Sequence, residues 1–407
     1  MQRKCNFSRT CESERETMPT HYDFDRIIER RDTQSAKWSH PNLLPLWVAD
    51  MDFESPPQVA EAIQRRAQHN IYGYDRIPKD YFKVVQGWFS RRQGFKVEKD
   101  WLVITSGVVE ALFLAIHAFT LPGDEVVIQP PVYHPFARSV LRSGRQLVNN
   151  PLKRVEGGYE LDLEDLEAKL SRPLVKLLIL CNPHNPIGKV YTPEELTAVG
   201  RLALKHDVLV ISDEIHSDLM LDGNRHTPFA SISQEFAQNS LTCTAPSKTF
   251  NLAGLATSNI FIPNPKLRDQ FTRFTESLGI KGGSVYGLIA AEAAYREGDE
   301  WLDQLLSYLG ANAAYFRHYL EENIPLITAD RLQGTYLQWV DFRKLGLNDE
   351  ELEAFLRDKA KLWLSQGHTF GSEGSGFIRF NLATPRANLT QALEQLAEAV
   401  RTLNRGS

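Results

Sequence analysis

Short apolar segments alternate with helix-period segments through the middle of the chain, and this alternation constrains the fold more than any other feature. Helical periodicity is seen in residues 108–119 and 193–206, and the second begins with Pro and acidic residues and ends with Lys and His. Continuous apolar strands separated by helices are typical of an α/β fold, in which helices cover both faces of a mostly parallel sheet. The predicted strands are residues 101–105, 125–129, 175–181, 207–212, 240–244 and 257–262.

The last hundred residues show a different pattern. Strand-like segments at 335–342 and 376–383 each precede a helical segment, at 349–363 and 388–403 respectively. This order predicts a smaller α+β domain at the carboxyl end of the chain.

The pattern divides the chain into four parts. Residues 1–18 are polar and predict a disordered tail, within which Met18 is an alternative start. We expect residues 19–55 to pack with the small domain, residues 56–298 to form the large domain, and residues 299–407 to form the small one.

Composition argues against several classes of protein. The 407-residue chain has a net charge of −5 and no long basic run, which disfavours nucleic acid and anionic membranes as partners. No apolar run approaches the roughly 18 residues that span a bilayer, and the start has no signal-peptide pattern. The four cysteines fit neither a zinc site nor a disulfide framework. These features predict a cytoplasmic protein without a metal site.

Chemically active residues follow several of the predicted strands. In open α/β sheets, ligands bind outside the carboxyl ends of the strands. Ser106 and Gly107 follow the first strand, and Asn185 lies in the NPHNPIG segment after the third. Asp213 and Lys248 follow the next two strands, so the topology predicts that these side chains share one region.

Lys248 and Asp213 are the strongest candidates for chemistry. Lys248 has no acidic residue near it in sequence, and its amine is either solvated or kept to form a Schiff base with a carbonyl ligand. Asp213 follows a buried strand, where it is either a helix cap or ion-pair partner, or a carboxylate that keeps a heterocyclic nitrogen protonated.

Three further features fit a planar phosphorylated ligand. The Ser106-Gly107 turn leads into a helix whose free N–H groups suit a phosphate, although such turns are also purely structural. Tyr133 either stacks on a ring or belongs to the core, and Asn185 either faces a ligand or closes its own turn. Together with a Schiff-base lysine and an acid, these features indicate pyridoxal 5′-phosphate.

The motifs also resemble a known family. NPHNPIGKVYTPEEL, ISDEIHSDL and SKTFNLAGL resemble fold-type I pyridoxal-phosphate enzymes, the aspartate aminotransferase superfamily, over residues 20–403. LPLWVADMDFESPP, NIYGYDRIP and GHTFG…GFIRFNLATPR are similar to MalY/PatB-type cystathionine or cysteine-S-conjugate β-lyases. The resemblance implies a large domain with a mostly parallel sheet, a smaller α+β domain, and a homodimer with shared active sites.

The resemblance implies a role for each matching residue. Lys248, Asp213 and Tyr133 would form the Schiff base, pair with the ring nitrogen and stack on the ring. Arg379 and the backbone at Ala49 would bind the substrate α-carboxylate, although Arg379 is alternatively a structural ion-pair partner. The remaining positions that would contact the cofactor are Asn185 and His216 at its 3′-oxygen, Ser106, Gly107, Val108, Val109 and Ser247 at its phosphate, and Tyr74 at the phosphate of the neighbouring subunit.

Two positions depart from the superfamily pattern. Many relatives have a serine three residues before the lysine and an arginine eight residues after it, both on the phosphate. Ala245 and Ala256 occupy these positions here. The alanine in place of arginine matches the β-lyase pattern, whereas Ala245 removes one expected phosphate contact.

The resemblance predicts a lyase that cleaves cystathionine or related cysteine S-conjugates to a thiol, pyruvate and ammonia by β-elimination. A class I/II aminotransferase is the alternative, and a regulator that binds a partner protein is a third possibility. A dinucleotide-binding dehydrogenase is disfavoured because no G-x-G-x-x-G follows a predicted strand. A metal site at Asp213 and His216 lacks a third ligand.

Overall fold

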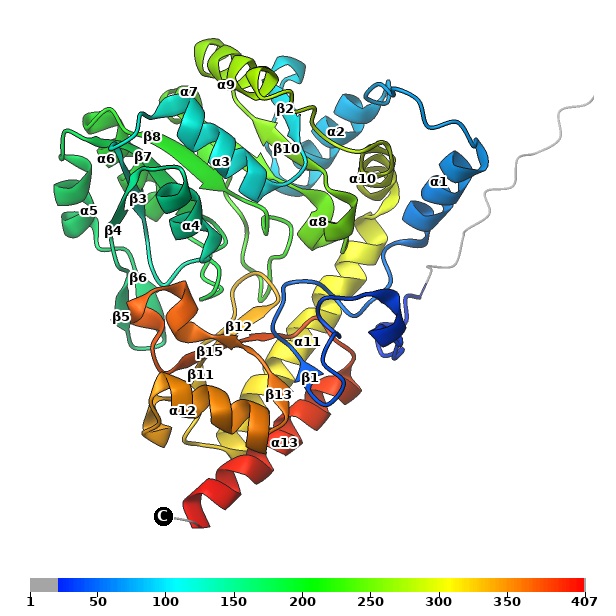
Figure 1. The fold of residues 1–407 in the computed structure, drawn as a ribbon, viewed down its shortest axis with the longest axis vertical. Helices are drawn as coiled ribbons and strands as arrows, with labels where there is room; N and C mark the ends of the chain where they lie inside the picture. The colour runs from blue at the N-terminus through cyan, green and yellow to red at the C-terminus, as the bar shows by residue number, and fades with distance from the viewer. Residues whose placement is uncertain (1–20, 406–407) are drawn as a thin grey trace, which may run out of the picture.

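A seven-stranded sheet forms the centre of the larger part of the molecule (Figure 1). The computed structural model describes residues 21–405, so the expected tail of residues 1–18 lies outside the described residues. Strands β4, β3, β7, β8 and β9 pair in parallel, whereas β10 runs antiparallel to both of its neighbours. The order is β2 (Leu102–Thr105), β10 (Ser258–Phe261), β9 (Ser240–Thr244), β8 (Leu209–Asp213), β7 (Val175–Cys181), β3 (Glu125–Ile128), β4 (Gln146–Asn149).

Helices cover both faces of this sheet, which explains why its strands are apolar on both sides. Successive residues of β7 belong to different clusters: Leu177 and Ile179 contact one set of helices, and Leu178 and Leu180 contact the other. The first face is covered by α3 (Val108–Phe119), α4 (Pro135–Arg142) and α9 (Pro265–Ser277), and the second by α5 (Leu163–Leu170), α6 (Pro193–Lys205) and α7 (Gln234–Gln238). The predicted mostly parallel α/β sheet is therefore confirmed.

A four-stranded antiparallel sheet forms the smaller part, in the lower half of Figure 1. The long helix α11 (Asp299–Asn323) runs between the two parts, and α13 (Arg386–Arg405) packs against it (Figure 1). The strand order is β11 (Thr328–Ala329), β12 (Leu337–Asp341), β15 (Phe377–Asn381), β14 (Ser365–Gln366). The expected boundaries at residues 55 and 298 remain predictions.

The segment before the large sheet contacts this smaller part. β1 (Leu44–Pro45) pairs in parallel with β13 (Leu362–Trp363), and Asn381 donates to the carbonyls of Val48 and Asp50. Beside it, Asp52 accepts from the buried Lys37 ammonium at 2.7 Å and from Arg30 at 2.6 Å. This network fixes residues 47–52, which we call the strap, and the strap carries Ala49 towards the large sheet.

The predicted helix at residues 349–363 is confirmed as far as Lys359 and is wrong in its last residues, where β13 begins at Leu362. α12 (Asp349–Ala354) begins with the predicted polar residues, capped by Asn348 and Glu351, and then widens into a π-helical turn, Phe355–Lys359. Lys361 adopts a left-handed φ of 57°, which ends the helix and allows β13 to follow.

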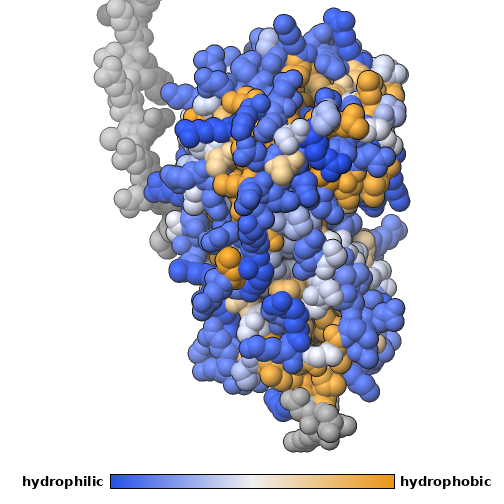
Figure 2. Space-filling model, turned by 90° about the vertical axis from the view of Figure 1, so that its left-hand side faces the viewer, coloured by the Kyte–Doolittle hydropathy of each residue, from blue (hydrophilic) through white to orange (hydrophobic). Residues whose placement is uncertain are grey.

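The remaining α-helices are α1 (Pro57–Gln68), α2 (Tyr81–Gln93), α8 (Pro246–Thr249) and α10 (Val285–Glu297). Among them, α1 and α2 pack against α10. Within residues 21–405, no helix combines the length and apolar character needed to cross a membrane. Figure 2 shows a mainly hydrophilic face, on which apolar residues form smaller groups.

Candidate active site

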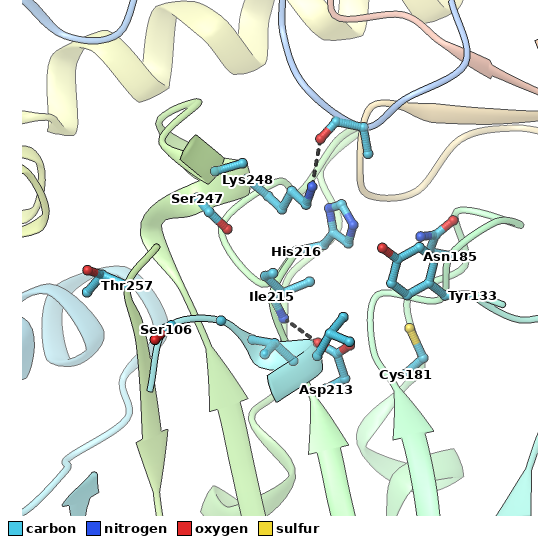
Figure 3. A pocket seen from close by; sticks show the side chains of 15 residues that line it. Ser106, Tyr133, Cys181, Asn185, Asp213, Ile215, His216, Ser247, Lys248 and Thr257 are labelled. Atoms are coloured by element: carbon cyan, nitrogen blue, oxygen red, sulfur yellow. Dashed lines mark hydrogen bonds between the residues drawn. The ribbon is translucent and has the colours of Figure 1, made fainter. Parts of the chain in front are cut away.

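A cavity of about 220 Å³ lies at the carboxyl ends of the parallel strands (Figure 3). Most of the residues that line it lie at or just beyond the ends of β2, β7, β8 and β9, as the topology predicts. The cavity is lined by eleven of the residues predicted from the sequence, namely Ala49, Ser106, Gly107, Val108, Val109, Tyr133, Asn185, Asp213, His216, Ser247 and Lys248.

Lys248 lies on the short helix α8 and extends into the cavity (Figure 3). Its Nζ donates to the carbonyl of Ala49 at 2.7 Å, and no carboxylate forms an ion pair with it among the described residues. Desolvation, together with the charge of Arg379, lowers the pKa of Lys248 to about 8. An amine with this pKa is available as a nucleophile or a base near neutral pH.

Asp213 ends β8 and is 4% exposed. Its carboxylate accepts one hydrogen bond, from the backbone N–H of Ile215 at 3.1 Å, and has no ion-pair partner among the described residues. Burial raises the pKa of Asp213 to about 7, and the neighbouring Glu214 adds to this effect. Asp213 therefore does not form the ion pair that its sequence position allowed. A cationic ligand would compensate the charge of its carboxylate.

Glu214 points to the opposite side of the strand end and has its own partners. It accepts from Ser212 at 2.8 Å and from the N–H of Phe229 at 2.9 Å, and its second oxygen lies 2.8 Å from Nε2 of His226. The two neighbouring acids thus differ in role. Both carboxylate oxygens of Glu214 have partners within the protein, whereas Asp213 faces the cavity.

His216 and Asn185 face the cavity from two loops (Figure 3). Nδ1 of His216 is buried without a hydrogen-bond partner, and burial keeps the pKa of this imidazole well below its usual range. Asn185 accepts from Arg379 at 2.9 Å through Oδ1, so its side chain does not close its own turn. A neutral His216 with an unused nitrogen fits a ligand that carries a hydroxyl or phenolic oxygen.

Arg379 lies behind Asn185, in the middle of β15, and is 4% exposed. It donates to the carbonyl of Trp47 at 2.8 Å and to Ser365 at 3.2 Å, and its Nε has no partner. Burial lowers the pKa of Arg379 to about 10. Because no carboxylate of the described residues pairs with it, the structural ion-pair interpretation is not observed, and an anionic ligand would compensate its charge.

The end of the cavity near β2 is suited to a phosphate. α3 begins at Val108 without a side-chain cap, so its first N–H groups remain free, and Ser247 and Thr257 add hydroxyls nearby (Figure 3). Lys248 is the only Lys or Arg that lines the cavity among the described residues. We call Ser106–Val109, Ser247 and Thr257 the phosphate seat, and it contains no fixed cation.

Five residues at the site were not predicted from the sequence. Tyr336 donates to the carbonyl of Ala49 at 3.1 Å and therefore shares this acceptor with Lys248. The cavity is also lined by Cys181, Ile215, Ala253 and Thr257. Cys181 and Thr257 lie at predicted strand ends, so their position could have suggested them, whereas the other three carry no such signal.

Tyr74 lies outside the cavity. Its side chain is fully exposed, and its ring centroid is 5.6 Å from Nζ of Lys281. Within one chain, Tyr74 therefore contributes nothing to the phosphate seat.

Comparison with known proteins agrees with the geometry. Residues 41–396 match the sequence profile of aminotransferase class I and II. The chain is 44% identical to cystathionine beta-lyase PatB of Bacillus subtilis over 93% of this chain and 100% of that protein. It is 32% identical to the protein MalY of Escherichia coli over 94% and 100%. The crystal structure of cystalysin from Treponema denticola, which contains pyridoxal 5′-phosphate, superposes with a TM-score of 0.92 at 37% identity, covering 94% of this chain and 100% of that one.

The raised pKa of Asp213 predicts that its ionised carboxylate destabilises the ligand-free protein at high pH. In the unfolded chain this carboxyl ionises near 3.8, and in the folded protein near 7. Between these values the folded protein binds more protons, so its free energy of unfolding falls as pH rises. Asp213→Asn should therefore stabilise the ligand-free protein by roughly 2–4 kcal/mol at pH 8 and by little near pH 4.

Urea unfolding at the two pH values measures this difference. Asp100→Asn, at an exposed aspartate, is the matched control and should change stability little at either pH. An Asp213→Asn variant that is less stable than the original protein at pH 8 would contradict the assigned cost.

Proposed function

Because the chain belongs to the aminotransferase class I and II family, we propose that it is a pyridoxal 5′-phosphate-dependent carbon–sulfur β-lyase acting on cystathionine or related cysteine S-conjugates. The observation that carries this proposal is that the Lys248 amine and the Asp213 carboxylate face one cavity without counter-ions. The full-length relatives named as β-lyases favour elimination over amino-group transfer.

The residues of the cavity fit this cofactor. The phosphate seat would hold the phosphate, Tyr133 would stack on the ring, and Asp213 would pair with the protonated ring nitrogen. The unused Nδ1 of His216 and the Nδ2 of Asn185 would face the 3′-oxygen. When bound, the cofactor supplies an aldehyde that condenses with amines and a ring that withdraws electrons.

The protein's own groups then bind and deprotonate the substrate. Arg379 binds the α-carboxylate and fixes the orientation of the Cα–H bond. The Lys248 amine, once free, removes the α-proton as general base, and its pKa of about 8 suits that task. Asp213 stays ionised beside the ring nitrogen and stabilises positive charge there. With water, cystathionine would yield homocysteine, pyruvate and ammonia.

The lyase proposal predicts that L-cystathionine alone is sufficient for turnover. The purified protein loaded with pyridoxal 5′-phosphate should release thiol and pyruvate in equal amounts without any 2-oxo acid, and Lys248→Ala should release neither. Thiol reagent and coupled lactate dehydrogenase measure the two products. A strict requirement for a 2-oxo acid would instead identify an aminotransferase.

The role of Arg379 predicts a selective effect on substrate binding. Arg379→Ala should raise KM for amino-acid substrates by about 10²-fold, because it removes a buried charge-assisted contact. The variant should still bind the cofactor, since Arg379 does not line the cavity. Arg343→Ala, which removes a half-exposed arginine just after β12, is the control. An unchanged KM would remove the assigned role.

We further propose that the chain forms a homodimer in which Tyr74 reaches the phosphate of the neighbouring subunit. The segment between α1 and α2, at the upper right of Figure 1, exposes four large apolar side chains: Ile71, Tyr72, Tyr74 and Ile77. Such a concentration is typical of a protein interface. The predicted cytoplasmic location, and the absence of nucleic-acid and membrane partners, remain predictions.

The dimer proposal predicts that one charge in this segment separates the subunits. Ile77→Asp should shift the protein towards monomer in sedimentation velocity and reduce lyase activity in parallel, because an ionised carboxylate is costly to bury. Leu174→Asp, at an exposed leucine elsewhere, should leave the sedimentation coefficient unchanged. A fully active monomer would contradict the shared site.

A further inference from the structure

The phosphate seat has a charge imbalance. A phosphate monoester carries about −1.5 to −2 charges at pH 7. The seat offers N–H groups and hydroxyls, and Ala256 occupies the position at which many members of the superfamily have an arginine. Lys248 cannot serve, because its amine points to Ala49 and is reserved for the aldehyde. The phosphate therefore needs a cation from outside the residues that line the cavity.

Lys281 lies in a loop that is fixed along the edge of the large sheet. A Cβ on the next residue, Gly282, would lie 1.7 Å from the carbonyl oxygen of Ile104, so the loop backbone lies directly against β2. Ser284 then caps α10 and donates to the carbonyl of Leu255 at 3.0 Å. Because β2 leads into Ser106, this loop lies at the same edge of the sheet as the phosphate seat.

The Lys281 ammonium is free of acidic partners. Its side chain is exposed, and no carboxylate forms an ion pair with it among the described residues. It makes a cation–π interaction with the ring of Tyr74, at 5.6 Å from Nζ to the centroid. By contrast, Arg66 near the same segment pairs with Asp75. Lys281 and Tyr74 thus form one exposed unit with an uncompensated positive charge.

We propose that Lys281 enters the active site of the neighbouring subunit together with Tyr74 and pairs there with the cofactor phosphate. Neither residue lines the cavity of its own chain, and their contact requires that both approach the same place. The ammonium would supply from the second subunit the charge that Ala256 does not provide in the first. This inference rests on the proposed cofactor and dimer.

Comparing the affinities of two ligands, one with a phosphate and one without, isolates the contribution of the phosphate to binding. The full-length protein is reconstituted with pyridoxal 5′-phosphate or with pyridoxal, which lacks the phosphate, and each dissociation constant is measured by absorbance titration. Lys281→Met, which keeps the apolar stem over Tyr74, should weaken pyridoxal 5′-phosphate binding about 10- to 100-fold and leave pyridoxal binding unchanged. Lys281→Arg should retain tight binding of both.

Arg76→Ala is the matched control, because Arg76 is an exposed cation of the same segment without a recorded contact to Tyr74. Its affinity for both ligands should be unchanged. An equal loss in Arg76→Ala, an equal loss for both ligands in Lys281→Met, or no loss in that variant would each overturn the role of Lys281.

Hybrid dimers test whether Lys281 of one subunit acts on the phosphate bound in the other subunit. Chains carrying Lys281→Met and Lys248→Ala are co-expressed with different tags, and the hybrid is purified through both. The first chain keeps Lys248 and would receive Lys281 from its partner, so the hybrid should show one site with normal pyridoxal 5′-phosphate affinity. A hybrid with only weakened sites would overturn the placement.

Failure of this inference differs from failure of the proposed function. If the original protein binds no pyridoxal 5′-phosphate, the proposed function itself is wrong. If it binds the cofactor with the normal Schiff-base absorbance and Lys281→Met does so equally well, only the role of Lys281 is wrong.

Discussion

Three charged groups are held in or beside one cavity without counter-ions, and the rest of the structure makes this arrangement possible. Burial raises the pKa of Asp213 and lowers those of Lys248 and Arg379, so each group is shifted towards its neutral form. Such shifts cost folding free energy, which only well-packed surroundings can offset. A cofactor with a protonated ring nitrogen and an aldehyde, together with a substrate carboxylate, would match all three groups. The ligand-free protein is therefore the strained state.

The contacts between the large part, the strap and the small sheet determine the geometry of these groups. The Ala49 carbonyl on the strap accepts from Lys248, on helix α8 beyond the large sheet, and from Tyr336 beside the small sheet. Thr335, which precedes Tyr336, is fully buried with a left-handed φ of 68°, an unfavourable conformation for a β-branched residue. Its N–H donates to the carbonyl of Leu219, just beyond His216. This conformation is tolerated where it orients a side chain towards a functional site.

The sequence predicted the part of the site that follows from chain topology. Asp213 and Lys248 were found because each lies at or within a few residues of the end of an apolar strand, and parallel strands end at one edge. Tyr336 could not be found in this way, since its role depends on how the small sheet meets the strap. Ile215 and Ala253 line the cavity through shape alone and carry no chemical signal. The end of the helical segment at Lys359 comes just before the left-handed Lys361, which helical periodicity does not reveal.

The position of each group in the sheet explains which functions one chain can provide alone. Asp213 ends β8 and Lys248 follows β9. Both strands have neighbouring strands on both sides, so one chain fixes and desolvates these two groups. Residues Ser106–Val109 of the phosphate seat follow β2, which among residues 21–405 is an edge strand paired with β10 alone. Around an edge strand, protein covers fewer directions, and a second chain has room to approach. With the catalytic groups inside the sheet, each subunit would carry out the chemistry with its own residues. With the phosphate seat at the edge, retention of the cofactor would depend on the dimer.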